Sequence, residues 1–130
     1  MTTKSKSKNG DGVGEKVSIK RAYDAPARGD GMRVLVDALW PRGVRKDDAK
    51  IDVWLKEIAP STELRSWFHH DPERWAEFRS RYRSELSKNA EAVAELKHLA
   101  RRGHLTLVYA ARDVEHNNAV VLQGLLNRSR

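Results

Sequence analysis

Cysteine is absent from the 130-residue chain, which excludes disulfide bonds, thiol nucleophiles and cysteine-ligated metal sites. Long apolar runs are absent too, since none approaches the roughly 20 residues that a membrane-spanning helix requires. The amino terminus carries lysines but lacks the apolar segment of a secretory signal. We therefore expect a cytoplasmic protein that does not associate with membranes.

Motifs that would name a cofactor are also missing. Gly-x-Gly-x-x-Gly, the P-loop pattern and His-Glu-x-x-His do not occur, which argues against ordinary dinucleotide, triphosphate and zinc-hydrolase sites. Neither a helix-turn-helix nor an RNA-binding signature is present. The sequence therefore leaves the cofactor unknown.

Acidic residues are fewer than basic residues in this chain. Lys and Arg number 25 against 18 Asp and Glu, so the formal net charge is +7, of which residues 1–16 carry four lysines against Asp11 and Glu15. A basic surface attracts nucleic-acid phosphates without sequence preference, but it also keeps a protein soluble. Solubility is the plainer explanation, and weak nucleic-acid binding stays open as a partner hypothesis.

The composition separates a tail from a folded part. Residues 1–16 are rich in Thr, Ser, Lys, Asn and Gly, and they predict a disordered basic tail because they cannot bury enough apolar surface. The length of residues 17–130 fits a single domain. We therefore expect one small α/β domain behind a disordered tail.

Short apolar runs predict the strands. Residues 33–37 contain Val-Leu-Val, and residues 105–110 read Leu-Thr-Leu-Val-Tyr-Ala, which is typical of strands covered on both faces. Residues 17–23 alternate and predict a first strand whose direction relative to the next is open. Residues 51–58 fit both the strand and the helix pattern, and we interpret them as a short extended segment.

Capping residues and a 3.6-residue apolar period predict the helices. The expected helical segments are a turn over 46–50, a short helix capped by Ser61 or Thr62, a helix that starts at Asp71-Pro72-Glu73 and buries Trp75, Phe78, Tyr82 and Leu86, a helix from Ser87 or Asn89 to residue 102, and a final helix over 115–127. Strands that alternate with helices in this way predict a mostly parallel sheet of three to four strands flanked by helices.

Polar residues follow the two buried strands, at the edge where open α/β sheets usually bind ligands. In one interpretation the protein is a hydrolase-like or other enzyme on a phosphorylated or nucleotide substrate. His116 is then a general acid or base that Asp37 or Asp113 orients, while arginines hold the anionic substrate and a helix starting near Glu115 adds backbone donors. In the other, Asp113 is an ordinary helix cap and Arg42 pairs with a carboxylate. The candidate substrate-binding residues are Arg42, Arg112, Trp40 and Asn117.

Other functional interpretations have weaker support in the sequence. A divalent ion on Asp37, Asp113 and His116 lacks a recognisable ligand motif, so we predict no metal site. A nucleic-acid platform would need exposed tryptophans, whereas the spacing of Trp67 and Trp75 favours interior packing. His69 and His70 precede the Asp71 helix start, where surface or capping roles are expected. The alternatives to an enzyme are a non-catalytic nucleic-acid binding module and a small-molecule or nucleotide sensor that uses the same edge of the sheet.

Several longer motifs give the chain a family resemblance. The motifs are Asp30-Gly31-Met32-Arg33-Val34-Leu35-Val36-Asp37, Leu39-Trp40-Pro41-Arg42-Gly43, Trp54 to Ser61, Trp67-Phe68-His69-His70-Asp71-Pro72, Leu107 to Ala111, and His116-Asn117. With them the chain resembles the domain of unknown function 488 family in its YeaO-like branch, which implies an α/β fold in a bacterial cytosolic protein and no established activity. The family pattern commonly has an arginine where this chain has Ala38, and more distant members have Cys-His-Arg where this chain has Glu115-His116-Asn117.

Overall fold

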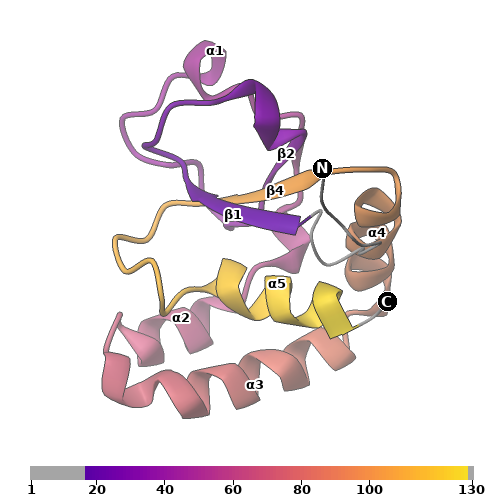
Figure 1. Ribbon diagram of the computed structural model, residues 1–130. Coiled ribbons are helices and arrows are strands. Elements are labelled where there is room, and N and C mark those ends of the chain that lie inside the picture. The colour runs from indigo at the N-terminus through magenta and orange to yellow at the C-terminus, as the bar shows by residue number, and fades with distance from the viewer. Residues whose placement is uncertain (1–16, 129–130) are drawn as a thin grey trace, which may run out of the picture.

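The computed structural model describes residues 17–128 of the chain (Figure 1). The predicted tail over 1–16 lies outside the described residues. A sheet of four parallel strands has the order β1-β4-β2-β3, and the direction of the first strand, which the sequence left open, is parallel to β4. The strands are β1 (Val17–Arg21), β2 (Met32–Leu35), β3 (Val53–Trp54) and β4 (Leu105–Tyr109).

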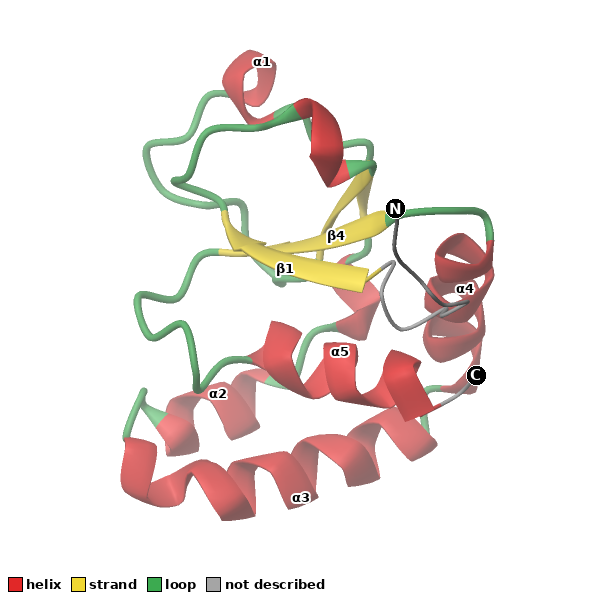
Figure 2. Ribbon diagram, in the orientation of Figure 1, coloured by secondary structure: helices red, strands yellow, loops and turns green. Residues whose placement is uncertain are grey.

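The helices complete the predicted α/β architecture (Figure 2). They are α1 (Lys46–Ala49), α2 (Thr62–Phe68), α3 (Trp75–Ser87), α4 (Ala90–Arg101) and α5 (Asn118–Arg128), with short 3-10 turns η2 (Arg28–Asp30), η3 (Lys56–Ile58) and η4 (Pro72–Arg74). Figure 1 shows α2, α3, α4 and α5 on one side of the sheet and α1 on the other. None of the helices within residues 17–128 has the length and apolar character needed to span a membrane.

Both faces of the two central strands are buried, which explains why their sequences carry apolar runs. Val34 and Leu107 face the large core beneath the helices, whereas Leu35 and Val108 face a smaller cluster with Trp40 and other partly buried side chains of the opposite face. Successive residues of a strand point to opposite faces. The covered-strand interpretation is therefore correct for β2 and β4.

Two segment boundaries differ from the prediction. The extended segment expected over 51–58 is only the two residues of β3, followed by η3, because Ile58 turns into the helical core, where it is fully buried. The final helix starts at Asn118 rather than at residue 115, because the Asp113 side chain holds residues 113–116 in a separate turn.

Polar contacts that are buried or partly buried fix α2 and α3 to each other and to η3. Ser61 caps α2 by accepting a hydrogen bond from the Leu64 backbone N–H at 3.1 Å, and its own hydroxyl donates to Glu85 Oε2 of α3 at 2.6 Å. The buried hydroxyl of Tyr82 donates to the Ile58 carbonyl at 2.5 Å. These bonds attach α3 to α2 and to residues 58–61, of which Ala59 and Pro60 line the cavity described next.

Candidate functional site

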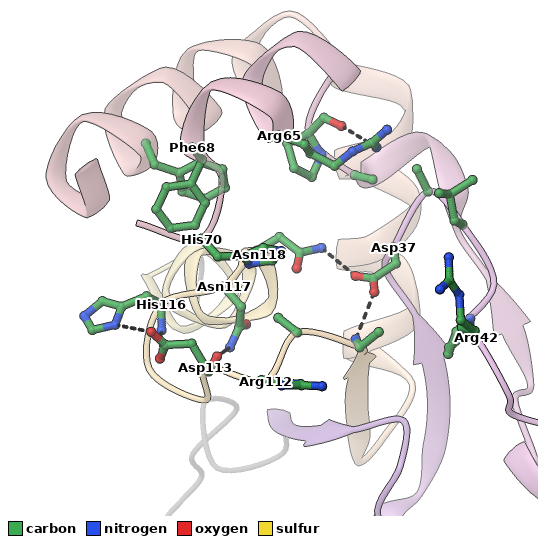
Figure 3. Close-up of a pocket in the computed structure, with 18 of the residues that line it drawn as sticks. Asp37, Arg42, Arg65, Phe68, His70, Arg112, Asp113, His116, Asn117 and Asn118 are labelled. Atoms are coloured by element: carbon green, nitrogen blue, oxygen red, sulfur yellow. Dashed lines mark hydrogen bonds and ion pairs between the residues drawn. The ribbon is translucent and has the colours of Figure 1, made fainter. Parts of the chain in front are cut away.

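A cavity of about 850 Å³ opens at the carboxyl ends of β2 and β4 (Figure 3). Three loops border it, each following a strand: residues 22–31 after β1, residues 36–45 after β2 and residues 110–117 after β4, with α2 and the first turn of α5 closing the side. The polar and ring-bearing residues that line the cavity are Tyr23, Asp37, Trp40, Arg42, Arg65, Phe68, His70, Phe78, Arg112, Asp113, His116, Asn117 and Asn118.

Asp37 joins three elements at the floor of this cavity. Its Oδ2 accepts a hydrogen bond from the Ala110 backbone N–H at 2.9 Å, and its Oδ1 accepts one from Asn118 Nδ2 at 3.1 Å. The same Asn118 amide donates to the Val36 carbonyl at 3.0 Å. Burial raises the pKa of Asp37, and the two hydrogen bonds oppose that rise only in part. Asp37 therefore holds the ends of β2, β4 and α5 together.

His116 is oriented by Asp113. Asp113 Oδ2 lies 2.8 Å from His116 Nδ1, and the imidazole meets the Trp75 ring edge-on at a centroid distance of 5.2 Å. Hydrogen bonds from His116 and from the Glu115 backbone lower the pKa of Asp113. An imidazole fixed through Nδ1 keeps Nε2 as its second polar atom.

The turn at Asp113 corrects the predicted helix start. Asp113 Oδ1 accepts hydrogen bonds from the backbone N–H groups of Glu115 and His116 at 2.9 and 3.0 Å, so these two donors are already used and are not free for an anion. Asn117 is the residue that caps α5, because its Oδ1 accepts from the Val120 N–H at 3.1 Å. The Asp113 pattern resembles a helix cap in sequence, but it forms a separate turn here.

The structure brings only some of the predicted catalytic residues into contact. Asp37 and His116 line the same cavity, yet Asp37 bonds to Ala110 and Asn118 rather than to the imidazole. Figure 3 shows the two side chains on separate sides of the cavity, with Asn117 and Asn118 between them in that view. Of the two acids considered for orienting His116, Asp113 is the one in contact.

The arginines of the cavity differ in how they are paired. Arg65 donates to the Pro60 carbonyl and to Thr62 Oγ1, each at 3.1 Å. The guanidinium groups of Arg42 and Arg112 make no hydrogen bond or ion pair with any residue in the described range 17–128. The interpretation that Arg42 pairs with a carboxylate is therefore wrong within that range.

Trp40 and Asn117 have structural partners at the cavity wall. The Trp40 indole N–H donates to the Val44 carbonyl at 2.7 Å, and its ring packs edge-on against Trp54 at 5.5 Å. Asn117 Nδ2 donates to the Asp113 carbonyl at 2.8 Å, and the residue is 3% exposed. Both side chains shape the loops around the cavity.

Sequence reasoning missed four residues of the site, namely Tyr23, Arg65, His70 and Asn118. His69 and His70 both have a left-handed backbone, with φ of 49° and 55°, and this turn brings the His70 ring to 6.3 Å from Phe68. His69 ends α2 by donating its backbone N–H to the Arg65 carbonyl at 3.0 Å. The capping role expected at this helix junction is confirmed for His69, but the sequence pattern did not indicate that His70 lines the cavity.

Metal-ligand types do not cluster in the described part of the chain. No group of three or more His, Asp or Glu side chains there is arranged to hold an ion. The distribution of Asp37, Asp113 and His116 described above agrees with that finding.

The comparisons with known proteins identify the family. A family model described as "Inactive DUF488-N3 subclade" matches residues 16–129. The chain belongs to this DUF488-N3 subclade. The uncharacterized protein Rv3073c of Mycobacterium tuberculosis (strain H37Rv) is 50% identical over 112 residues, which is 86% of this chain and 94% of that protein. The uncharacterized protein YeaO of Escherichia coli K12 is 44% identical over 106 residues, or 82% and 92% of the two chains. No solved structure matches the chain.

The motifs that carried the resemblance form much of the cavity wall in this DUF488-N3 chain. The loop Leu39 to Gly43 contributes Trp40 and Arg42, and the Trp67 to Pro72 segment contributes Phe68 and His70. The strand end at Leu107 to Ala111 contributes Ala110 and Ala111. The resemblance therefore concerns the walls of the cavity as well as the core of the fold.

The two acids of the site should have opposite effects on stability as pH changes. A carboxyl whose pKa is raised in the folded protein contributes most to the free energy of unfolding when it is protonated. The parent should therefore gain stability relative to Asp37→Asn as pH falls from neutrality towards about 4. Asp113 has a lowered pKa, so the parent should lose its advantage over Asp113→Asn as pH falls below about 4. Urea unfolding of all three proteins between pH 3 and pH 7 measures both trends. Parallel trends for the two variants would contradict the described environments.

Proposed function

We propose that this protein binds a small anionic ligand, through a phosphate or carboxylate group, at the cavity on the carboxyl edge of the sheet. One observation carries the proposal: Arg42 and Arg112 line the cavity and their guanidinium groups have no partner among residues 17–128. Guanidinium groups match phosphate and carboxylate oxygens in a two-point geometry. An unpaired guanidinium in a concave site is therefore a ready anion contact.

The charged side chains around Arg42 and Arg112 also favour an anionic ligand in the cavity. Arg65 provides a third cation on the same cavity, and its positive charge lowers the pKa of Asp37 against the larger effect of burial. The acids of the cavity are engaged, since Asp37 accepts from Ala110 and Asn118 and Asp113 pairs with His116. The open charge in the cavity is thus positive.

Binding without turnover is the form of the proposal that we favour. The description of the family model calls the subclade inactive, and Asp37 is not in contact with His116. A hydrolase-like activity on a phosphorylated substrate is the second candidate, because the Asp113 and His116 pair resembles an oriented general base. The two candidates share the anion site and differ in whether the imidazole takes part in chemistry.

The test compares arginines inside and outside the cavity. Isothermal titration with ribose 5-phosphate should give binding to the parent that weakens by about tenfold or more in Arg42→Gln and in Arg112→Gln, since a charge-assisted hydrogen bond is worth about 1.5–3 kcal/mol. Arg83→Gln removes the same charge from the exposed surface of α3, where the side chain has no partner in the described range, and it should change the affinity less than about twofold.

Three outcomes separate the alternatives. Equal weakening in all three variants would mean non-specific attraction to a basic protein and would overturn the proposal, as would no binding by the parent. Phosphorus NMR of the same samples reports hydrolysis directly. Release of inorganic phosphate by the parent and not by His116→Ala would establish the second candidate in place of binding alone.

A further inference from the structure

We infer that the ligand of this cavity carries a planar ring beside its phosphate, as a nucleoside monophosphate does, and that Tyr23 is the surface on which the ring stacks. This inference rests on the proposed anion site and specifies its ligand class. It starts from the size of the cavity. A volume of about 850 Å³ is in the range of pockets that hold whole organic ligands, roughly 300–1,000 Å³, whereas a bare phosphate group would fill only a small part of it.

Exposed apolar side chains occur on the loops that border the cavity. The large hydrophobic residues that are exposed within residues 17–128 are Tyr23, Leu39 and Val114, at 47%, 74% and 55%. Tyr23 and Leu39 line the cavity, and Val114 follows Asp113 in the third loop around it. Each of the three bordering loops thus presents one exposed apolar side chain. Tyr23 and Leu39 therefore add exposed apolar surface to a cavity whose cations are arginines, as a ligand with an apolar part requires.

Tyr23 is held in a fixed position despite its exposure. Its hydroxyl donates to the Arg42 carbonyl at 2.8 Å, and the Arg21 guanidinium lies over its ring at 4.9 Å from the centroid. Arg21 is itself fixed, because its Nε donates to the Ala111 carbonyl at 2.9 Å and its Nη2 to the Ala110 carbonyl at 3.3 Å. An exposed ring that is held at both its hydroxyl and its face is preorganised for contact with a ligand.

The Tyr23 contacts also link the ring to the anion site. The hydroxyl bond joins Tyr23 to the loop that carries the Arg42 side chain, and the Arg21 bonds join it to the backbone directly before Arg112. An aromatic platform attached to the two loops that carry Arg42 and Arg112 suits a molecule with a planar ring at one end and a phosphate at the other. Every base has a planar face, so stacking on an aromatic side chain is sequence-tolerant and the structure does not select one base.

The experiment separates the ring from the phosphate. Isothermal titration compares ribose 5-phosphate with AMP, GMP, CMP and UMP on the parent, Tyr23→Leu, Tyr23→Phe and Arg112→Gln. At least one nucleotide should bind the parent about tenfold or more tightly than ribose 5-phosphate does. Tyr23→Leu, which keeps apolar bulk without an aromatic plane, should remove most of that difference, whereas Tyr23→Phe should keep most of it. Arg112→Gln should weaken the sugar phosphate and the nucleotides by similar factors.

The outcomes distinguish this inference from the proposed function. If ribose 5-phosphate binds and no nucleotide binds more tightly, the stacking inference is wrong and the anion site stands. If neither class binds, both proposals fail. If Tyr23→Leu retains the full preference while its thermal unfolding matches that of the parent, the ring stacks elsewhere and Tyr23 is not the platform.

Discussion

Replacing Asp30 with alanine should lower the free energy of unfolding by about 3–5 kcal/mol, the usual cost of removing one partner from a buried ion pair. Asp30 Oδ2 lies 2.6 Å from Arg33 Nη1, and Oδ1 lies 2.9 Å from Lys20 Nζ. Arg33 is only 3% exposed. Without Asp30 its guanidinium keeps one bond, from Nε to the Ala49 carbonyl at 3.0 Å, and its charge stays buried without a counter-ion.

The control variants separate this effect from a general loss of acidic charge. Asp24→Ala removes an exposed carboxylate that has no side-chain partner among the described residues and should change the stability by no more than about 0.5 kcal/mol. The double variant Asp30→Ala with Arg33→Met should recover much of the loss, because no buried charge is left unpaired. Urea unfolding followed by circular dichroism measures all four proteins. A loss below about 1 kcal/mol for Asp30→Ala would contradict the described network.

The pH dependence gives a second measurement of the same contact. Burial alone would raise the pKa of Asp30, but hydrogen bonds from the Ala27 backbone, Lys20 and Arg33 outweigh it and lower the pKa to about 2. The folded value lies below the ordinary value of 3.8, so the stability from this group is complete above about pH 4 and is lost as pH falls towards 2. The advantage of the parent over Asp30→Ala should therefore decrease across that interval.

This network marks a limit of sequence reasoning. Glycines and a proline between residues 24 and 31 indicated a loop, and nothing in that pattern shows that the loop places a carboxylate against Lys20 of β1 and Arg33 of β2. The contact depends on Arg33, which lies at a buried position of β2 where the sequence alone predicts an apolar residue. By contrast, the apolar runs around Val34 and Leu107 predicted strands covered on both faces, because a strand buried on both faces has apolar residues at consecutive positions.

At the site, too, local sequence patterns predicted the position of residues but not their contacts with distant parts of the chain. The edge at which Asp37, Arg42 and His116 gather was predictable, since parallel strands present their carboxyl ends together. The pairing within that edge was not, because Asp37 bonds across the sheet to Ala110 and Asn118. Short sequence spacing correctly joined Asp113 to His116, which lie three residues apart. Contacts between distant segments had no comparable signal.

Replacing Gly31 with alanine should destabilise the protein by about 3 kcal/mol or more, because two independent effects coincide there. The residue has φ of 65° and ψ of −141°, a conformation that costs a side-chain-bearing residue about 1–3 kcal/mol. A Cβ on this backbone would also lie 2.4 Å from the His104 carbonyl oxygen and 2.8 Å from its carbon. That carbonyl accepts the Met32 N–H at 3.0 Å, at the point where β2 begins to pair with β4.

Two other glycines separate these effects. Gly43→Ala tests the backbone conformation alone, because its φ is 80° and no atom lies within 4 Å of an added Cβ, so the expected loss is about 1–2 kcal/mol. Gly29→Ala has neither constraint and should remain within about 0.5 kcal/mol of the parent. Urea unfolding should thus order the three variants, with Gly31→Ala the least stable.

Hydrogen exchange at Met32 gives a second measurement. The clash in Gly31→Ala is with the His104 backbone, so it can be relieved only by moving β2 away from β4. The Met32 amide hydrogen should then exchange faster in Gly31→Ala than in Gly43→Ala. Equal losses for Gly31→Ala and Gly43→Ala, with Met32 still protected, would show that the two strands are not held as closely at this end as the structure describes.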